Sequence, residues 1–249
     1  MDAVASSVHA ALDQLLHLAD NALVLGQRNA EWCGNGPVLE EDIALANMSL
    51  DLIGQARMLY QHAAAVTGNG ATEDSLAYFR DAGDFRNFTL LELPHASATS
   101  DRDYAVTITR NFLYSAYMLL QWEALQASSD AQLAGIAGKS LKEVRYHFRH
   151  SRDWLVRLGD GTAESQQRTQ TALNQLMPYT AEFWAGAPAT LRAHWDGLVN
   201  DALGEAGLSR PPLLQAALPQ GKNGHHSEHL APLLAEMQSL ARAHPQAQW

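Results

Sequence analysis

The stretch LKEVRYHFRH, residues 141–150, decides how this sequence is interpreted. On a helix it places Glu143, Tyr146 and His147 within one turn, because side chains three and four positions apart share a face. A carboxylate and an imidazole are good metal donors, whereas a neutral phenol is a poor one. The stretch is therefore either part of a metal site or a helix from which such a site has been lost, and the other helices decide between the two.

Helical periodicity recurs along the chain, while the period-2 alternation of β-strands is almost absent. The glycine-rich sequences CGNGP, TGNG and GDGT end three of the helical segments. Ser129 and Gln132 are expected to form a capping box ahead of the helix that carries residues 141–150. Helices are predicted at about residues 3–30, 38–66, 73–79, 102–126, 130–158, 163–183, 190–206 and 227–243.

The four long segments form two pairs, which are separated by the connection RDAGDFRNFTLLELPHASATS at residues 80–100. A connection of this length can cross the end of a helix bundle. Two helix pairs joined by one long crossover are typical of the ferritin-like four-helix bundle. We therefore predict an all-α, ferritin-like four-helix bundle with additional C-terminal helices, in a single domain over residues 1–249.

The composition narrows the class of protein. A formal net charge of −10 does not suit a nucleic-acid-binding protein, which needs Lys and Arg against phosphates. No stretch approaches the ~18 uninterrupted apolar residues of a membrane span, and the N-terminus does not resemble a signal peptide. Cys33 is the only cysteine, so no intrachain disulfide can form, and we expect it to be a small buried residue. We expect a cytoplasmic protein with no nucleic-acid or membrane partner.

The polar positions of the four long helices offer few metal ligands. A di-iron site in a ferritin-like bundle uses about four carboxylates and two histidines. Asp51 is followed at i+3 by Gly54, which has no donor atom. Ser115 is the only polar member of the stripe on the third long helix, and Gln27 gives a neutral amide on the first. Too little negative charge is present to neutralise two buried iron ions.

Several stretches resemble one protein family. They are NALVLGQRNAEWCG (21–34), EDIALANMSLDLIGQAR (41–57), TLLELP (89–94), KEVRYHFRHSRDWLVRLGDGT (142–162) and HHSEHLAPLLAEMQSLARAHPQAQW (225–249). Together they are similar to the C subunits of the phenylacetyl-CoA epoxidase complex of bacterial phenylacetate degradation, over about residues 12–249. The resemblance implies a ferritin-like fold and a structural, non-catalytic subunit. The degenerate positions of the di-iron site are then Gln27, Asp51, Gly54, Ser115, Glu143, Tyr146 and His147.

The resemblance also implies partners and cofactors. A homologous A subunit pairs with the C subunit and carries the di-iron site, and other subunits join the complex. The complex adds one oxygen atom across the aromatic ring of phenylacetyl-CoA, with electrons from NADPH through a separate reductase. No metal or cofactor is then expected in this chain. A self-sufficient non-haem di-iron oxygenase, or an iron-binding ferritin-like protein, is the alternative.

Without metal, the carboxylate of Glu143 has to be satisfied in another way. It either pairs with an Arg or His of a neighbouring helix or takes up a proton on desolvation. We expect hydrogen bonds among Glu143, His147, Gln27 and Asp51 at the place where the irons of a ferritin-like protein lie.

Two polar stretches outside the long helices have more than one interpretation. In DFRNF, residues 84–88, Asp84, Phe85, Arg86 and Asn87 are candidate contacts to an anionic CoA thioester or to the partner chain, because arginine binds phosphate well. The alternative is a loop packed by its two phenylalanines.

HHSEH groups His225, His226, Glu228 and His229 near the predicted start of the last helix. It is interpreted as a polar helix start or an interface cluster in preference to a metal site, because no further ligand is apparent nearby. Core or interface anchors are expected at Trp32, Trp122, Trp154 and Trp195.

Overall fold

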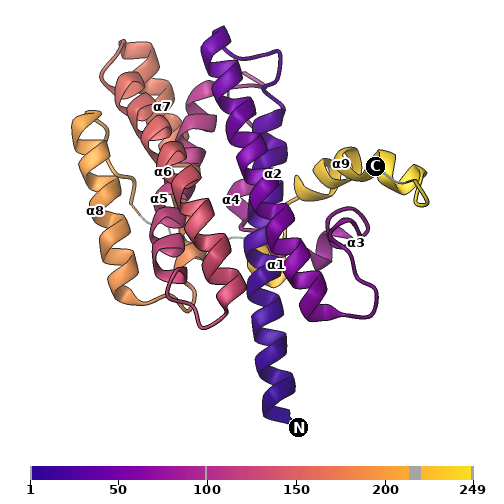
Figure 1. Ribbon diagram of the computed structural model, residues 1–249. Coiled ribbons are helices and arrows are strands. Elements are labelled where there is room, and N and C mark those ends of the chain that lie inside the picture. Colours follow the sequence, from indigo (N-terminus) through magenta and orange to yellow (C-terminus); the bar gives the residue numbers. More distant parts are fainter. Residues whose placement is uncertain (1, 99, 213–219, 248–249) are drawn as a thin grey trace. The chain divides into compact units, whose positions relative to one another are not determined.

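The computed structural model describes residues 2–98, 100–212 and 220–247, and within these ranges it is helical with no β-strand (Figure 1). The all-α class predicted from the sequence is confirmed. The chain divides into two compact units, made of the described residues of Met1–Leu93 with Pro219–Trp249 (unit 1) and of Pro94–Leu218 (unit 2). That the two units form a single domain stays a prediction.

Unit 1 is built on an antiparallel hairpin of two long helices, α1 (Asp2–Ala30) and α2 (Leu39–Thr67) (Figure 1). The helices approach closely at Gly26, where a Cβ would lie 3.3 Å from Cγ1 of Ile53. A larger residue at this position would separate the helices or displace that side chain. The α2 helix ends at Thr67, and its C-cap Gly68 has a φ of 67°, which favours glycine, as the TGNG signal predicts.

Shorter elements complete unit 1, and they come from both ends of the sequence. They are α3 (Glu73–Tyr78), η1 (Ala82–Asp84), α4 (Thr89–Glu92), η3 (Gly221–Asn223) and α9 (Leu230–Ala243). The first turn of α3 is fixed by a capping box between Thr72 and Ser75. The α9 helix packs against α3 and η1, so the C-terminal segment belongs to the same unit as the N-terminal hairpin.

Unit 2 is built around α5 (Tyr104–Leu125), which α6, α7 and α8 all contact. Every residue of α5 from Ala105 to Met118 is buried. The surrounding elements are α6 (Ala131–Gly159), α7 (Ala163–Leu176), the 3₁₀ segment η2 (Met177–Trp184) and α8 (Ala189–Glu205). Because α5 is buried on all sides, its polar side chains lie in the interior, so unit 2 has a polar interior as well as an apolar one.

The tryptophans are anchors, as predicted. Trp32, Trp122 and Trp195 are buried, and the indole N–H of Trp195 donates to the carbonyl of Leu113 at 3.1 Å. Trp154 is half-buried and meets the ring of Tyr104 edge to face. In the described residues, no helix is long and apolar enough to cross a membrane.

Three local predictions are wrong. The N-cap of α6 is Asp130 and not Ser129, because its carboxylate accepts from the backbone N–H groups of Gln132 and Leu133. Cys33 is exposed, since it lies in the turn that follows α1. The helix predicted to reach residue 183 ends at residue 176 and continues as 3₁₀ turns, where Pro178 removes a backbone donor.

Candidate functional site

Unit 1 contains three of the predicted degenerate positions: Gln27 on α1, and Asp51 and Gly54 on α2. All three are half-buried. A Cβ built at Gly54 would meet no atom within 4 Å, so the neighbouring side chains leave room at this position. Gln27 carries an amide and Gly54 has no side chain, so Asp51 is the one of these three residues that supplies a carboxylate.

Unit 2 contains the other four positions, of which Ser115 lies on α5 and the rest on α6. The hydroxyl oxygen of Ser115 lies 3.3 Å from that of Ser151, and the Ser151 hydroxyl donates to the carbonyl of His147 at 2.6 Å. These contacts join the middle of α5 to α6. The Ser115 hydroxyl is thus part of the contact between α5 and α6.

The α6 residues at i+3 and i+4 from Glu143 face different surroundings. His147 is buried, with 3% of its surface exposed, whereas Tyr146 is 39% exposed. The Tyr146 ring lies 5.9 Å from that of His150, and the Arg149 guanidinium lies 5.9 Å from its centroid. The residue with a usable donor, His147, is therefore the one on the buried side of the helix. The predicted hydrogen bonds between Glu143, His147, Gln27 and Asp51 stay a prediction.

The donors at the seven positions do not fit a di-iron centre. Two carboxylates and one imidazole are present, in Asp51, Glu143 and His147, where such a centre uses about four carboxylates and two histidines. Across the part of the chain that the structure describes, no three His, Cys, Asp or Glu side chains come together as a metal site.

The DFRNF segment is built into unit 1. Phe85, Asn87 and Phe88 are fully buried, and the guanidinium of Arg86 donates to the carbonyls of Gly83 and Phe85. The structure therefore shows the loop packed by two phenylalanines that was the alternative interpretation. Asp84 is exposed, and its contact with a CoA thioester or a partner chain stays a prediction, as does that of Phe85, Arg86 and Asn87.

A buried polar network that the sequence analysis missed centres on Asp20 of α1. Its carboxylate, which is fully buried, accepts from the Tyr60 hydroxyl at 2.5 Å and forms an ion pair with Arg80. It also accepts from the backbone N–H of Arg86 at 2.7 Å, which fixes the crossover segment on α1. Burial, and then the Asp20 charge, raise the pKa of Tyr60 well above its ordinary value.

A second missed residue is His17, one turn earlier on α1. Its Nδ1 lies 2.6 Å from the carbonyl oxygen of Arg86, which can only accept, so Nδ1 carries the proton. The Asn21 amide then donates to Nε2 at 3.2 Å, and its oxygen accepts from the backbone N–H of Phe88 at 2.7 Å. The pKa of His17 is lowered to about 4, mainly by burial; the hydrogen bond to the Arg86 carbonyl opposes this shift, and the nearby charge of Lys222 adds to it.

The HHSEH segment contributes to the same unit through one histidine. Nε2 of His226 donates to the carbonyl of Phe85 at 2.9 Å, and its Nδ1 lies 3.4 Å from the buried carboxylate of Glu92. His225 is exposed, and His229 is partly exposed. The α9 helix begins only at Leu230, so the segment precedes the helix and joins it to the crossover.

Comparison with known proteins identifies the family of this chain. The family described as "Phenylacetic acid catabolic protein" matches residues 2–249. The chain belongs to this family. It is 45% identical over 248 residues to the C subunit of 1,2-phenylacetyl-CoA epoxidase from Escherichia coli (strain K12), with 94% of this chain and 97% of that protein covered. The resemblance and the ferritin-like class predicted from the sequence are confirmed.

In this member of the family of phenylacetic acid catabolic proteins, the contact between the C-terminal segment and the crossover depends on a glycine. A Cβ at Gly221 would lie 2.2 Å from the carbonyl oxygen of Asn87, which is backbone and cannot move aside cheaply. We expect Gly221→Ala to lower the free energy of unfolding by about 3 kcal/mol in urea denaturation. Gly83→Ala is the control, because a Cβ there meets nothing within 4 Å. Equal stability of the two variants would contradict the close approach.

Proposed function

We propose that this chain is a non-catalytic, structural subunit of a multicomponent 1,2-phenylacetyl-CoA epoxidase in aerobic phenylacetate catabolism. It pairs with a homologous A subunit that holds the di-iron site, and NADPH supplies electrons through a separate reductase. The similarity to the C subunit of the Escherichia coli epoxidase, together with the donor-poor positions on the long helices, supports this proposal. The complex acts in the cytoplasm on a CoA thioester.

The observation that carries the proposal is the chemistry of the positions where ligands are needed. Gly54 offers no donor atom, the Ser115 hydroxyl takes part in the contact between α5 and α6, and Tyr146 lies partly in solvent. A bundle with these residues cannot neutralise two iron ions, since uncompensated charge in a low-dielectric interior is severely unfavourable. The same bundle can still act as a scaffold.

The interior of the chain suits a scaffold. The Asp20–Arg80 ion pair, the neutral His17 and the contact of Glu92 with His226 hold the crossover segment against α1 and the C-terminal segment. Ligand helices of a catalytic site have to be held within a fraction of an ångström by a supporting structure. A rigid partner with the same helical architecture provides such support over a large interface.

Metal analysis tests the proposal. We expect the chain purified alone to contain no stoichiometric iron, and the complex co-expressed with the catalytic A subunit to contain iron that stays with that subunit when the two are separated. Glu143→Gln in this chain is expected to leave the iron content of the complex unchanged. About two irons per isolated chain, with oxygen-dependent turnover, would instead support a self-sufficient di-iron protein.

A further inference from the structure

The exposed large apolar side chains of the described residues gather in unit 1, with Tyr146 as the exception in unit 2. Isolated exposed apolar residues are normal, whereas a contiguous group marks an interaction site. We call this group the α2–α3–α9 face. Its members are Val38, Leu39, Ile43, Leu50, Ile53, Phe79 and Leu240.

Most of the face is a stripe along α2. Leu39, Ile43, Leu50 and Ile53 recur at intervals of four, seven and three residues, which places them on one side of the helix. Leu39 is 73% exposed and Leu50 is 66% exposed. The stripe extends over about 21 Å along the helix axis. Since other residues of α2 pack against α1, this helix is apolar on a second side that the described residues of unit 1 leave uncovered.

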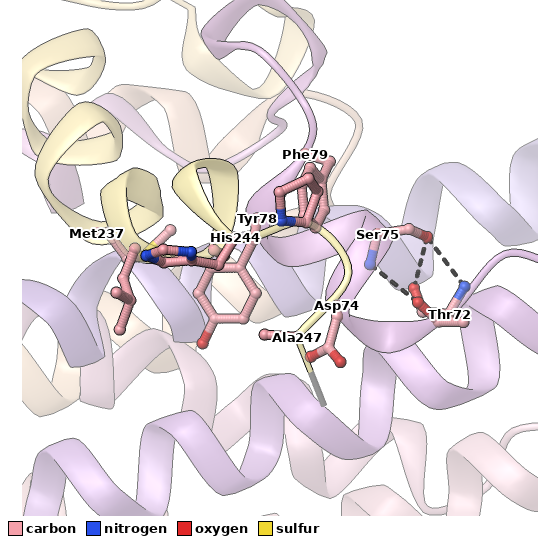
Figure 2. Close-up of a pocket in the computed structure, with 11 residues that line it drawn as sticks. Thr72, Asp74, Ser75, Tyr78, Phe79, Met237, His244 and Ala247 are labelled. Atoms are coloured by element: carbon pink, nitrogen blue, oxygen red, sulfur yellow. Dashed lines mark hydrogen bonds between the residues drawn. The ribbon is translucent and has the colours of Figure 1, made fainter. Parts of the chain in front are cut away.

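A cavity lies between α3 and α9, beside the Ile53 end of the stripe. A small hollow lies between Ile53 of the stripe and Asp74 and Tyr78 of α3. Asp74 and Tyr78 also line the larger cavity, which has a volume of about 560 Å³. Figure 2 shows Tyr78, Met237 and His244 around it, with Phe79 at its border. The Ile53 end of the stripe therefore lies next to α3, whose Asp74 and Tyr78 also line the cavity.

Acidic side chains predominate around this surface. Glu40 and Asp74 are exposed, whereas the cations Arg57 and Arg242 are each paired with a carboxylate, that of Glu73 at 2.9 Å and that of Asp81 at 3.0 Å. The whole chain carries a formal charge of −10. Two copies that met through this face would bring like charges together, which disfavours self-association. The surface fits a different chain that presents apolar residues flanked by Lys or Arg.

We propose that the α2–α3–α9 face is the docking surface for the catalytic partner subunit. It takes an apolar helix face with basic flanks and one bulky apolar side chain in the cavity beside Tyr78. This assignment rests on the proposed function, since it names the surface through which the scaffold holds its partner. An apolar patch of a few hundred Å² is the centre that a stable interface of ~800 Å² per partner requires.

The affinity for the co-expressed catalytic partner tests the assignment. Leu39→Glu combined with Leu50→Glu is expected to raise the dissociation constant at least about a hundredfold, because two carboxylates would be buried against an apolar helix. Both side chains are largely exposed in this chain, so its circular dichroism and urea unfolding midpoint should not change. The matched control is Ala193→Glu, which adds a carboxylate at an exposed position of α8 in unit 2.

Each outcome is decisive. Loss of binding in the double variant, with Ala193→Glu binding like the parent, supports the assignment. Binding of the double variant within about twofold of the parent overturns the assignment and leaves the proposed function in place. No binding of the parent chain overturns both. Another outcome is a parent that sediments as a homodimer, which the double substitution dissociates. That result would show that the face binds a second copy of this chain, and it would overturn the assignment to a different subunit.

Discussion

Replacing Asp20 with Asn is expected to lower the free energy of unfolding by about 3–5 kcal/mol. The substitution keeps the size of the side chain and removes the charge that faces the guanidinium of Arg80, which has 13% of its side-chain surface exposed. An amide also accepts more weakly than a carboxylate from the Tyr60 hydroxyl and from the backbone N–H of Arg86. The large effect comes from leaving a buried cation without its partner, and the ion pair itself need not stabilise the fold by that amount.

Urea unfolding followed by circular dichroism measures this change, and the chain offers a matched control. Asp81 also pairs with an arginine of unit 1, Arg242, but its side chain is 84% exposed. Asp81→Asn should therefore change the stability by less than about 1 kcal/mol. Adding Arg80→Met to Asp20→Asn should restore part of the loss, because the unpaired charge is then removed. Similar losses for the two Asp→Asn variants would show that burial does not decide the effect.

The sequence predicted the long helices well because two independent signals agree there. Apolar periodicity marks the interior of α2, and glycines mark its end, so the predicted residues 38–66 differ by one residue at each end from Leu39–Thr67. The α6 start was ambiguous because SSD offers three capping residues in a row, and only the geometry selects Asp130. The position of Cys33 depends on how a turn sits on the surface, for which the residue type gives only a weak preference.

The candidate site could be predicted in its composition but not in its contacts. The missing donors at Gly54 and Tyr146 are visible in the residue types alone. The contact of Glu92 with His226 joins residues 134 positions apart, and no local periodicity connects them. The network on α1 did leave a signal, since Asp20 and the following Asn interrupt the apolar run LLHLADNALVL at positions that the periodicity places inside. Polar residues inside an apolar stripe indicate partners elsewhere in the chain.

The second large effect is a loss of stability in acid that originates at His17. Its ordinary pKa is 6.5, and burial lowers it to about 4 in the folded chain. Above pH 6.5 the imidazole is neutral in both states, and the stability is fully present. As the pH falls below 6.5 the unfolded chain binds a proton that the folded chain does not, so stability is lost progressively down to about pH 4. The total reaches about 3 kcal/mol, of which about 2 kcal/mol is lost by pH 5.

The pH dependence of urea unfolding between pH 7.5 and 4.5 isolates this contribution. His17→Gln is expected to be less stable than the parent at pH 7.5 and to lose about 2 kcal/mol less on going to pH 5, because the replacement does not titrate. His9→Gln is the control, since it removes an exposed histidine from the same helix. If the parent and His17→Gln lose the same stability between these pH values, His17 is protonated in the folded chain. Its Nε2 would then carry a proton and could no longer accept from the Asn21 amide.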